Sequence, residues 1–153
     1  MKIAIQKAQS HQIEIAFEML KETALWIGEK NINQWKCWID PTDKIKDIVV
    51  KGFESGEFYF AYNNNEIVGM YRLTNNDEWF WQDNGKDNAV YLHQFTTMRE
   101  YKGKGLGGFI LAEIENNLRK ENVRFLRFDC YAQNKGLCDW YEKNGFVAKG
   151  IKL

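Results

Sequence analysis

The sequence predicts a single α/β or α+β domain, residues 1–153, in which helices cover a central sheet. Apolar residues recur at helical spacing in several segments, and runs rich in aromatic and β-branched residues lie between these segments. The chain is long enough for one core, and it contains no internal repeat, low-complexity tract or linker that would divide it.

The N-terminal part of the chain predicts a strand followed by two helices. Residues 1–5, MKIAI, have the composition of a short strand. Ser10 is expected to cap a helix that ends at Gly28 or in the NIN segment. Asp43 is expected to cap a second helix, which Gly56 closes. The apolar residues of the first helix follow one another at helical spacing: Ile13, Ala16, Phe17, Leu20, Ala24 and Ile27.

The middle of the chain favours strands. Residues 57–62 and 66–73 are rich in aromatic and β-branched residues, and the three asparagines between them predict a hairpin turn. Residues 78–82, EWFWQ, fit either a third strand or a loop. Residues 89–98, AVYLHQFTTM, predict a strand that leads into a glycine-rich loop.

The C-terminal third predicts helices and strands in alternation. Residues 124–132 alternate as a strand does, and residues 134–145 fit a short helix that Gly145 ends. Residues 146–153 are expected to form a last short strand. A helix is expected after the glycine loop because apolar residues recur there every four positions: Leu106, Ile110, Ile114 and Leu118.

The composition argues against several classes of partner. Basic and acidic residues balance at a formal net charge of zero, so no basic surface for nucleic acid or an anionic membrane is expected. The N-terminus lacks the apolar region of a signal peptide, and no apolar run is long enough to cross a bilayer. The widely spaced Cys37, Cys130 and Cys138 favour free thiols in a reducing cytoplasm, and their spacing predicts no metal site.

A glycine-rich stretch, REYKGKGLGG at residues 99–108, separates a predicted strand from a predicted helix. Residues 103–108 match the G-x-G-x-x-G pattern of dinucleotide-binding folds, and Asp129 follows at about the spacing of their ribose-binding acid. The polar segment 99–102 before the first glycine argues against that interpretation, as do the few residues left after Asp129. A dinucleotide-binding oxidoreductase fragment is therefore the weaker alternative.

The loop fits a second pattern better. Residues 102–107, KGKGLG, resemble the Gln/Arg-x-x-Gly-x-Gly/Ala pyrophosphate loop of the GCN5-related N-acetyltransferase (GNAT) family. Asn134 follows the next predicted strand, as an asparagine often does in that family, and Tyr141 stands in DWYEKNGF, which resembles the family's Tyr-Glu-x-x-Gly-Phe ending. The resemblance is specific over residues 89–146, and over residues 1–88 it rests on element order alone.

This resemblance implies a mixed, mostly antiparallel GNAT-like sheet and acetyl-CoA as the co-substrate. Glycines let a backbone approach a pyrophosphate, and the N-terminus of the helix at Leu106 favours negative charge. The pantetheine arm is expected along the backbone of the central strand. Asn134 could also be only a helix cap. The expected cofactor-binding residues are Phe95, Thr96, Thr97, Lys102, Gly103, Lys104, Gly105, Leu106, Gly107, Gly108 and Asn134.

The resemblance also makes Tyr141 the expected catalytic acid, which protonates the leaving thiolate. Helical spacing alone would instead have Tyr141 pack on the sheet beside Trp140. Direct attack of an amine in a ternary complex is expected because no activated nucleophile is apparent. The base that deprotonates the amine stays open between ordered water and four side chains: His93, Glu78, Asp83 and Asp129.

The acceptor is expected to be a primary amine of a small molecule, because no acidic cluster suited to a basic protein tail is present. A non-catalytic acyl-CoA-binding module of the same fold is the other alternative. Family members usually end with two strands after the Gly-Phe motif, and this sequence has room for one. Tryptophans and a phenylalanine could line the acceptor pocket, or instead form core or a homodimer interface: Trp79, Phe80 and Trp81, with Trp35 and Trp38.

Overall fold

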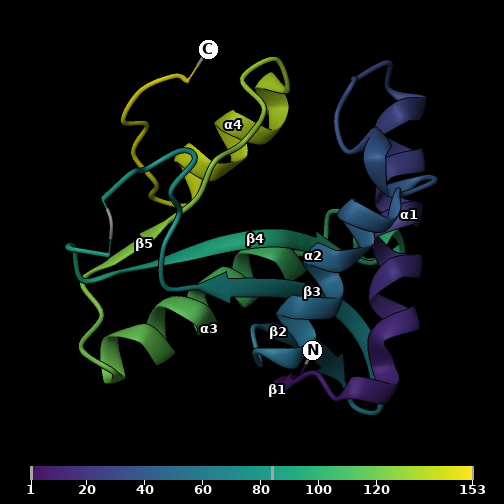
Figure 1. Cartoon of the computed structure of the whole chain (residues 1–153), viewed down its shortest axis with the longest axis horizontal. Coiled ribbons are helices and arrows are strands. Elements are labelled where there is room, and N and C mark those ends of the chain that lie inside the picture. The colour runs from purple at the N-terminus through teal and green to yellow at the C-terminus, as the bar shows by residue number, and fades with distance from the viewer. Residues whose placement is uncertain (1, 84, 153) are drawn as a thin grey trace.

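A computed structural model describes residues 2–83 and 85–152 of the chain. Its strands form one sheet in the order β1-β2-β3-β4-β5, in which every pair is antiparallel except the parallel pair β4–β5 (Figure 1). The expected mixed, mostly antiparallel sheet flanked by helices is therefore confirmed. The elements are β1 (Ile3–Lys7), η1 (Ser10–Gln12), α1 (Ile13–Glu29), η2 (Lys36–Trp38), α2 (Asp43–Glu54), β2 (Phe58–Asn63), β3 (Glu66–Thr74), β4 (Ala89–Thr97), η3 (Arg99–Tyr101), α3 (Leu106–Lys120), β5 (Phe125–Arg127) and α4 (Lys135–Lys143).

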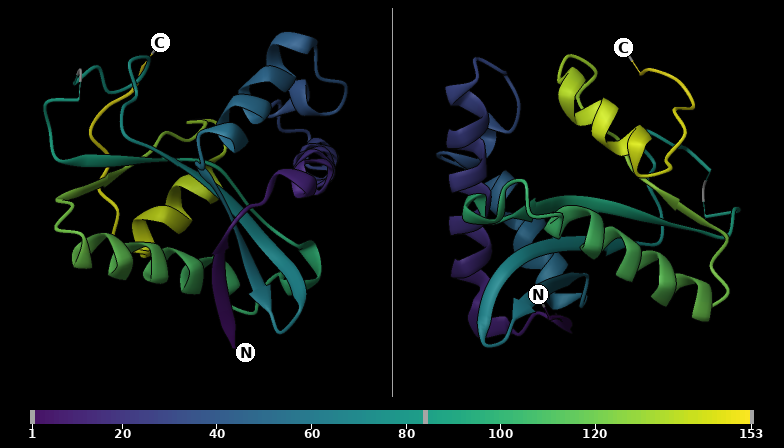
Figure 2. Two further views of the ribbon diagram at one scale, coloured as in Figure 1. Left: turned by 60° about the horizontal axis from the view of Figure 1, so that its bottom comes forward. Right: turned by 180° about the vertical axis from the view of Figure 1, so that it is seen from behind.

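The helices cover both faces of the sheet (Figure 2). Helices α1 and α2 lie on one face, and α3 lies on the other with α4 near the β5 edge. Each face has its own apolar core because side chains alternate between the two faces along a strand. The α1/α2 core includes Ala16, Leu20, Val49, Phe58, Phe60 and Met70, and the α3 core includes Ala61, Val68, Leu92, Leu106, Ile110 and Ile114.

A short parallel pairing leaves a wedge between β4 and β5. The two strands pair only over Ala89–Phe125, Val90–Leu126 and Tyr91–Arg127, and beyond this point the chain after β5 turns away from β4. The remaining part of β4 therefore has an open edge on that side. An open edge presents unpaired backbone donors and acceptors, to which an extended ligand can hydrogen-bond.

Arg127 holds the closed end of this wedge together. Its guanidinium donates to the Tyr91 hydroxyl at 3.1 Å and pairs with Asp87 at 2.9 Å and Asp83 at 3.5 Å. Hydrogen bonding from Tyr91 is the largest cause that lowers the pKa of Asp83. The β3–β4 connection, β4 and β5 thus meet at one side chain.

A β-bulge in β4 interrupts the alternation of its side chains. Met70 faces Thr96 and Arg72 faces His93, so β4 has one residue more than β3 between these pairs. Gln94 takes the strain with a φ of 43°. His93 consequently points to the α1/α2 side, where it lines a pocket with Arg72, whereas Phe95 packs into the α3 core. Regular alternation without the bulge would place His93 and Phe95 on one face.

Two predicted helix caps are corrected. Ser10 begins the η1 turn instead, and the Gln12 Oε1 accepts a hydrogen bond from the Gln9 N–H at 2.9 Å, which stabilises that turn. Thr42 rather than Asp43 caps α2, because its Oγ1 accepts a 3.4 Å bond from a backbone N–H of the first turn.

The C-terminal region is less regular than predicted. Strand β5 covers only Phe125–Arg127 of the expected 124–132, and residues 146–152 form no strand, with Val147 and Ile151 73% and 76% exposed. Because β5 has only three residues, it offers too few backbone N–H and C=O groups to pair with the expected last strand. Residues 78–82 form turns, not a strand. Met1 and Leu153, at the ends of the predicted terminal strands, lie outside the described residues.

Across residues 2–83 and 85–152, no helix combines the length and apolar character that a membrane span requires.

The contact between α3 and the sheet gives a stability prediction. Ile110 is fully buried, and a Cβ added at the strand residue Gly69 would lie 2.8 Å from Ile110 Cδ1, so the helix rests directly on the β3 backbone. We expect Ile110→Ala to lower the free energy of unfolding by about 2–5 kcal/mol and Ile110→Val by about 0.5–1.5 kcal/mol. Urea denaturation measures both, and equal effects of the two variants would contradict this tight contact.

Candidate active site

The glycine loop presents free backbone N–H groups at the start of α3. Gly103 and Gly105 have φ values of 77° and 76°, the left-handed region that favours glycine. Gly105 is the N-cap and no side chain caps the helix; the Phe109 N–H bonds to Gly105 O at 3.0 Å. The N–H groups of the first three helical residues therefore have no intrahelical partner and can bind an anion.

The next two glycines have a different role. A Cβ at Gly107 would lie 3.0 Å from the Trp140 ring, and a Cβ at Gly108 would lie 3.1 Å from Asn144 Oδ1. Only glycine lets α4 pack this closely on the first turn of α3. Through this contact, Tyr141, the neighbour of Trp140, lies on the helix that packs against the glycine loop.

A cationic cluster lies beside the loop around the ring of Trp26 in α1. Lys30 Nζ is 3.9 Å from the ring centre, and Arg99 and Lys102 are 5.1 and 5.6 Å from it. Burial, Lys102 and Arg99 lower the pKa of Lys30. Sequence reasoning identified Lys102 but missed Trp26 and Lys30, because nothing in the pattern of α1 indicates that it ends beside this loop.

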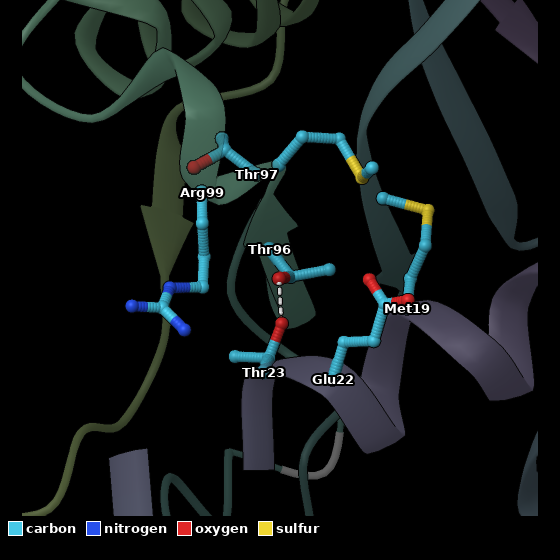
Figure 3. A pocket seen from close by; sticks show the side chains of 7 residues that line it. Met19, Glu22, Thr23, Thr96, Thr97 and Arg99 are labelled. Atoms are coloured by element: carbon cyan, nitrogen blue, oxygen red, sulfur yellow. Dashed lines mark hydrogen bonds between the residues drawn. The ribbon is translucent and has the colours of Figure 1, made fainter. Parts of the chain in front are cut away.

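The side chains at the end of β4 are largely occupied by packing. Thr96 is buried and its hydroxyl hydrogen-bonds to that of Thr23, which fixes β4 to α1. Thr97 lines a cavity of about 10 Å³ between α1 and β4, with Thr23 and Arg99 around it (Figure 3). That volume suits about one water molecule. Backbone groups of these residues and of Phe95 are therefore what remains for a ligand at the open edge of β4.

Tyr141 lies among aromatic rings on the inner side of α4. Its ring centre is 4.3 Å from that of Phe128 and 5.1 Å from that of Trp140, and Phe146 stands edge-on at 6.0 Å. Burial raises the pKa of Tyr141, and the nearby Cys130 and Asp129 raise it further. The phenol is therefore protonated throughout the neutral pH range.

Asn134 is the N-cap of α4, as one of the two interpretations required. Its Oδ1 accepts from the Leu137 N–H at 3.2 Å, and its Nδ2 donates to Gln34 Oε1 at 3.0 Å. It thereby connects α4 to the segment between α1 and α2.

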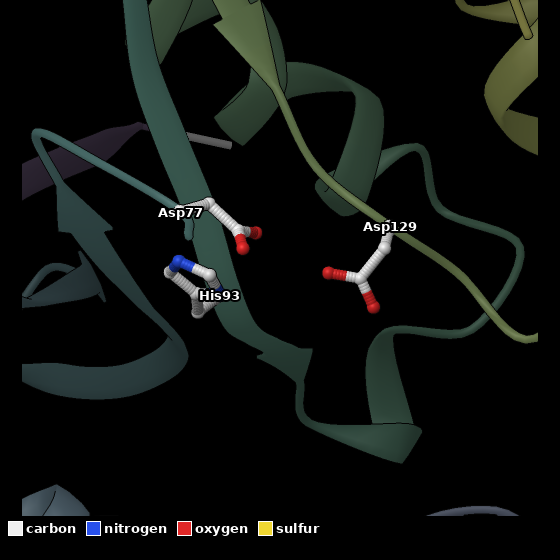
Figure 4. Close-up of side chains that lie close together, drawn as sticks. All are labelled: Asp77, His93 and Asp129. Carbon is white, nitrogen blue, oxygen red and sulfur yellow. The ribbon is translucent and has the colours of Figure 1, made fainter. Parts of the chain in front are cut away.

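The structure brings Asp77, His93 and Asp129 together at the wedge. One ligand-type atom of each lies within 4.8 Å of the others, and in Figure 4 the two carboxylates point toward one another. Asp77 Oδ1 accepts backbone N–H bonds from Trp79 at 3.1 Å and Phe80 at 2.9 Å. Asp77 Oδ2 is buried and has no hydrogen-bond partner among residues 2–83 and 85–152. These three side chains could hold a cation, although the sequence contains no metal-type spacing.

The pKa values of two cluster residues, Asp129 and His93, are shifted. Burial raises the pKa of Asp129 to about 6, and the charge of Asp77 adds to the rise. Asp129 as a whole is exposed, and its carboxylate lies close to that of Asp77. Burial lowers the pKa of His93, as does the positive charge of Arg72. His93 Nε2 is 3.1 Å from the Thr74 hydroxyl.

A cavity of about 440 Å³ opens beside the cluster on the α1/α2 side of the sheet. Ligand pockets typically have volumes of this order. Glu57 and Arg72, which pair at 3.0 Å, lie in its wall. The other lining residues come from β3, β4 and the connection between them: Thr74, Asn75, Asn76, Asp77, Glu78, Trp79 and His93.

Of the aromatic side chains expected at the acceptor pocket, Trp79 lines this cavity and is 67% exposed. Trp81 instead donates its indole N–H to Phe128 O at 3.3 Å. Trp38 is buried in the α1/α2 core, and Trp35 packs against that core. Asp83, one of the four side chains considered as base, faces Arg127.

Cys130 and Cys138 lie close together behind Tyr141, with their sulfur atoms 3.3 Å apart. Burial raises the pKa of the Cys130 thiol to about 12, and its contact with Cys138 adds to the rise. A thiol with such a pKa is protonated at neutral pH and is a poor nucleophile.

Comparison with known proteins defines the class to which this fold and site belong. The model of the acetyltransferase (GNAT) family matches residues 9–146, so the chain belongs to this family of N-acetyltransferases, whose co-substrate is acetyl-CoA. The antiparallel sheet also rules out the dinucleotide-binding interpretation, which requires a mostly parallel one.

Individual relatives agree with this assignment. The chain is 27% identical over 136 residues to the uncharacterized N-acetyltransferase YesJ of Bacillus subtilis, covering 86% of this chain and 74% of that protein. A GNAT-family acetyltransferase structure from Listeria monocytogenes has a TM-score of 0.81 at 24% identity, over 98% of this chain and 89% of that one. The PaiA N-acetyltransferase of Thermoplasma acidophilum, solved with coenzyme A, has a TM-score of 0.74 at 21% identity, over 99% and 94%.

The acidic cluster predicts how His93 titrates. The charge of Asp77 raises the pKa of His93 against the larger lowering by burial. We therefore expect Asp77→Asn to lower the pKa of His93 further. An NMR pH titration of the histidine ring signals measures it, with Glu121→Gln, on the far end of α3, as a control that removes one charge elsewhere. A pKa of His93 that rose in Asp77→Asn would contradict the cluster geometry.

Proposed function

We propose that this protein transfers the acetyl group of acetyl-CoA to a primary amine of a small molecule, by direct attack in a ternary complex. The observation that carries the proposal is the wedge between β4 and β5. The glycine loop lies at one end of this wedge, and Tyr141 lies on one side of it. The cavity beside Asp77 and His93 lies on the opposite face of the sheet. A co-substrate entering from the loop and an amine entering from the cavity would meet where the strands separate.

The loop supports the phosphate part of this proposal. Free N–H groups at the start of α3 and the helix dipole both favour a pyrophosphate. Lys102 and Lys104 add positive charge beside these groups, and Lys30 and Arg99 extend the positive region toward α1. Because the whole chain has a net charge of zero, this cluster is a local feature suited to an anion.

The backbone of Phe95, Thr96 and Thr97 is proposed to bind the pantetheine arm. In the described part of the chain, the edge of β4 past Tyr91 has no strand partner on the β5 side, so its amides and carbonyls are available to an extended ligand. One of these amides would stabilise the oxyanion that forms when the amine attacks the thioester carbonyl.

Direct attack is favoured over a covalent intermediate. Cys130, a neighbour of Tyr141, has a raised pKa and is therefore not activated. Tyr141 is proposed to donate its proton to the departing thiolate. The protons that the attacking nitrogen loses pass to the base, which is water or one of the side chains at the cavity and cluster: His93, Glu78 or Asp129. Burial keeps the phenol of Tyr141 protonated but also makes it a weaker acid, so the support for this role is its position. Trp140 packs α4 against the loop that would hold the coenzyme.

The loop assignment predicts the effect of Gly105→Glu. The new side chain would strain a residue with positive φ and bring a carboxylate to the phosphate position. We expect the affinity for acetyl-CoA to fall by more than tenfold in isothermal titration calorimetry. Gly85→Glu is the matched control, because Gly85 has a φ of 70° and open space around it in the β3–β4 connection. Unchanged affinity in Gly105→Glu would reject the loop as the phosphate site.

The acid assignment predicts the effect of Tyr141→Phe. Phenylalanine retains the ring contacts with Phe128 and Phe146 and removes only the hydroxyl. We expect kcat to fall by about 100-fold, within the usual range for a lost general acid, while acetyl-CoA binding is retained. Thiol release with a panel of primary amines measures turnover. If kcat and its pH profile stay unchanged, Tyr141 has a packing role only.

A further inference from the structure

One carboxylate oxygen in the cavity has no partner. Asp77 is 7% exposed, and its Oδ1 is satisfied by two backbone N–H groups that fix the turn after β3. Its Oδ2 is buried without a hydrogen bond to any described residue, and the Asp77 carboxylate belongs to the cluster with His93 and Asp129. A buried carboxylate oxygen left unsatisfied beside a second carboxylate is costly, and a cation placed between them would remove that cost.

We propose that Asp77, His93 and Asp129 form the recognition site for the acceptor's ammonium group. The acceptor is then an alkylamine, which is cationic at neutral pH, and not an arylamine, which is neutral there. This inference rests on the proposed function and specifies its substrate class.

The spacing of the cluster is compatible with an ammonium group. An ammonium nitrogen that donates three tetrahedral hydrogen bonds of about 2.9 Å holds its acceptors about 4.7 Å apart. The three acceptor atoms here lie within 4.8 Å of one another.

The position of the cluster fits an amine that attacks at the wedge. His93 precedes the bulge in β4, and Asp129 follows the end of β5, so the two stand on opposite sides of the point where these strands separate. Asp77 reaches the same point from the β3–β4 connection (Figure 4). The nitrogen held by all three would therefore lie at the opening toward the β4 edge.

The charge of the cavity agrees with a cationic occupant. Arg72 compensates Glu57, whereas Asp77 and Glu78 bring further negative charge to the same wall. Trp79 offers an exposed ring, against which Lys152 Nζ already lies at 4.6 Å, so this wall can contact an alkylammonium. His93 contributes a nitrogen acceptor without charge, in keeping with its lowered pKa.

The test is binding of n-butylammonium chloride, followed by NMR of the His93 ring in the full chain without acetyl-CoA. We expect saturable shifts with n-butylammonium, and none with 1-butanol or with sodium chloride at the same ionic strength. In Asp77→Asn and Asp129→Asn the dissociation constant should rise at least tenfold, while Glu121→Gln should change it less than twofold.

The two aspartate variants separate binding from folding. Asp77→Asn keeps the Oδ1 that accepts from the Trp79 and Phe80 N–H groups, so the turn after β3 is retained. Asp129 does not hold this turn. A loss of n-butylammonium affinity in both variants therefore reports the ammonium site. No saturable binding to the wild type, equal affinity for 1-butanol, or unchanged affinity in both variants would overturn the inference. So would tighter, stoichiometric binding of Zn²⁺ at His93 that excludes n-butylammonium.

A parallel calorimetric titration with acetyl-CoA separates this inference from the proposed function. Retained acetyl-CoA binding in Asp77→Asn, with ammonium binding lost, supports both. Absence of acetyl-CoA binding in the wild type rejects the proposed function while leaving the cation site in place. Intact acetyl-CoA binding and amine turnover with no preference for alkylamines over aniline reject the ammonium site alone.

Discussion

The architecture of the site depends on how few residues of β4 and β5 pair. Parallel pairing at Tyr91 and Arg127 is the last contact before the strands separate, and the Arg127 guanidinium holds this point through Tyr91, Asp87 and Asp83. A longer β5 would satisfy the edge of β4 and fill the space that a ligand needs. The site therefore requires a short β5. Because β5 makes few backbone hydrogen bonds to β4, the side chains around Arg127 stabilise the contact between the two strands.

The bulge in β4 distributes side chains around that opening. Because Gln94 is an extra residue, Phe95 belongs to the α3 core and His93 faces the cavity on the other side. Without the bulge, one of these two side chains would lie on the wrong face: an imidazole in an apolar core, or a phenyl ring in a polar cavity. The positive φ of Gln94 is the local cost of this arrangement.

The sequence predicts those parts of the protein that local pattern controls. Helix α3, the glycine loop before it and the Asn134 cap of α4 can each be predicted from a short stretch of sequence. The family resemblance through the loop and Tyr141 follows from the same short stretch. What pattern could not predict is contact between distant segments. Trp26 reaches the loop from α1, and the buried Asp77 looks like an ordinary turn residue in the sequence.

The two oxygens of Asp77 connect fold and chemistry in one side chain. Oδ1 fixes the turn after β3 by accepting two backbone N–H groups, and this fixed turn holds the carboxylate, with its buried Oδ2, beside His93 and Asp129. A carboxylate on a mobile loop would turn to solvent and avoid the repulsion of Asp129. The backbone contacts prevent that escape and keep the carboxylate close to Asp129, so a cation bound between the two would relieve their repulsion. The same rigidity that makes this oxygen unfavourable in the free protein makes it selective for a positively charged ligand.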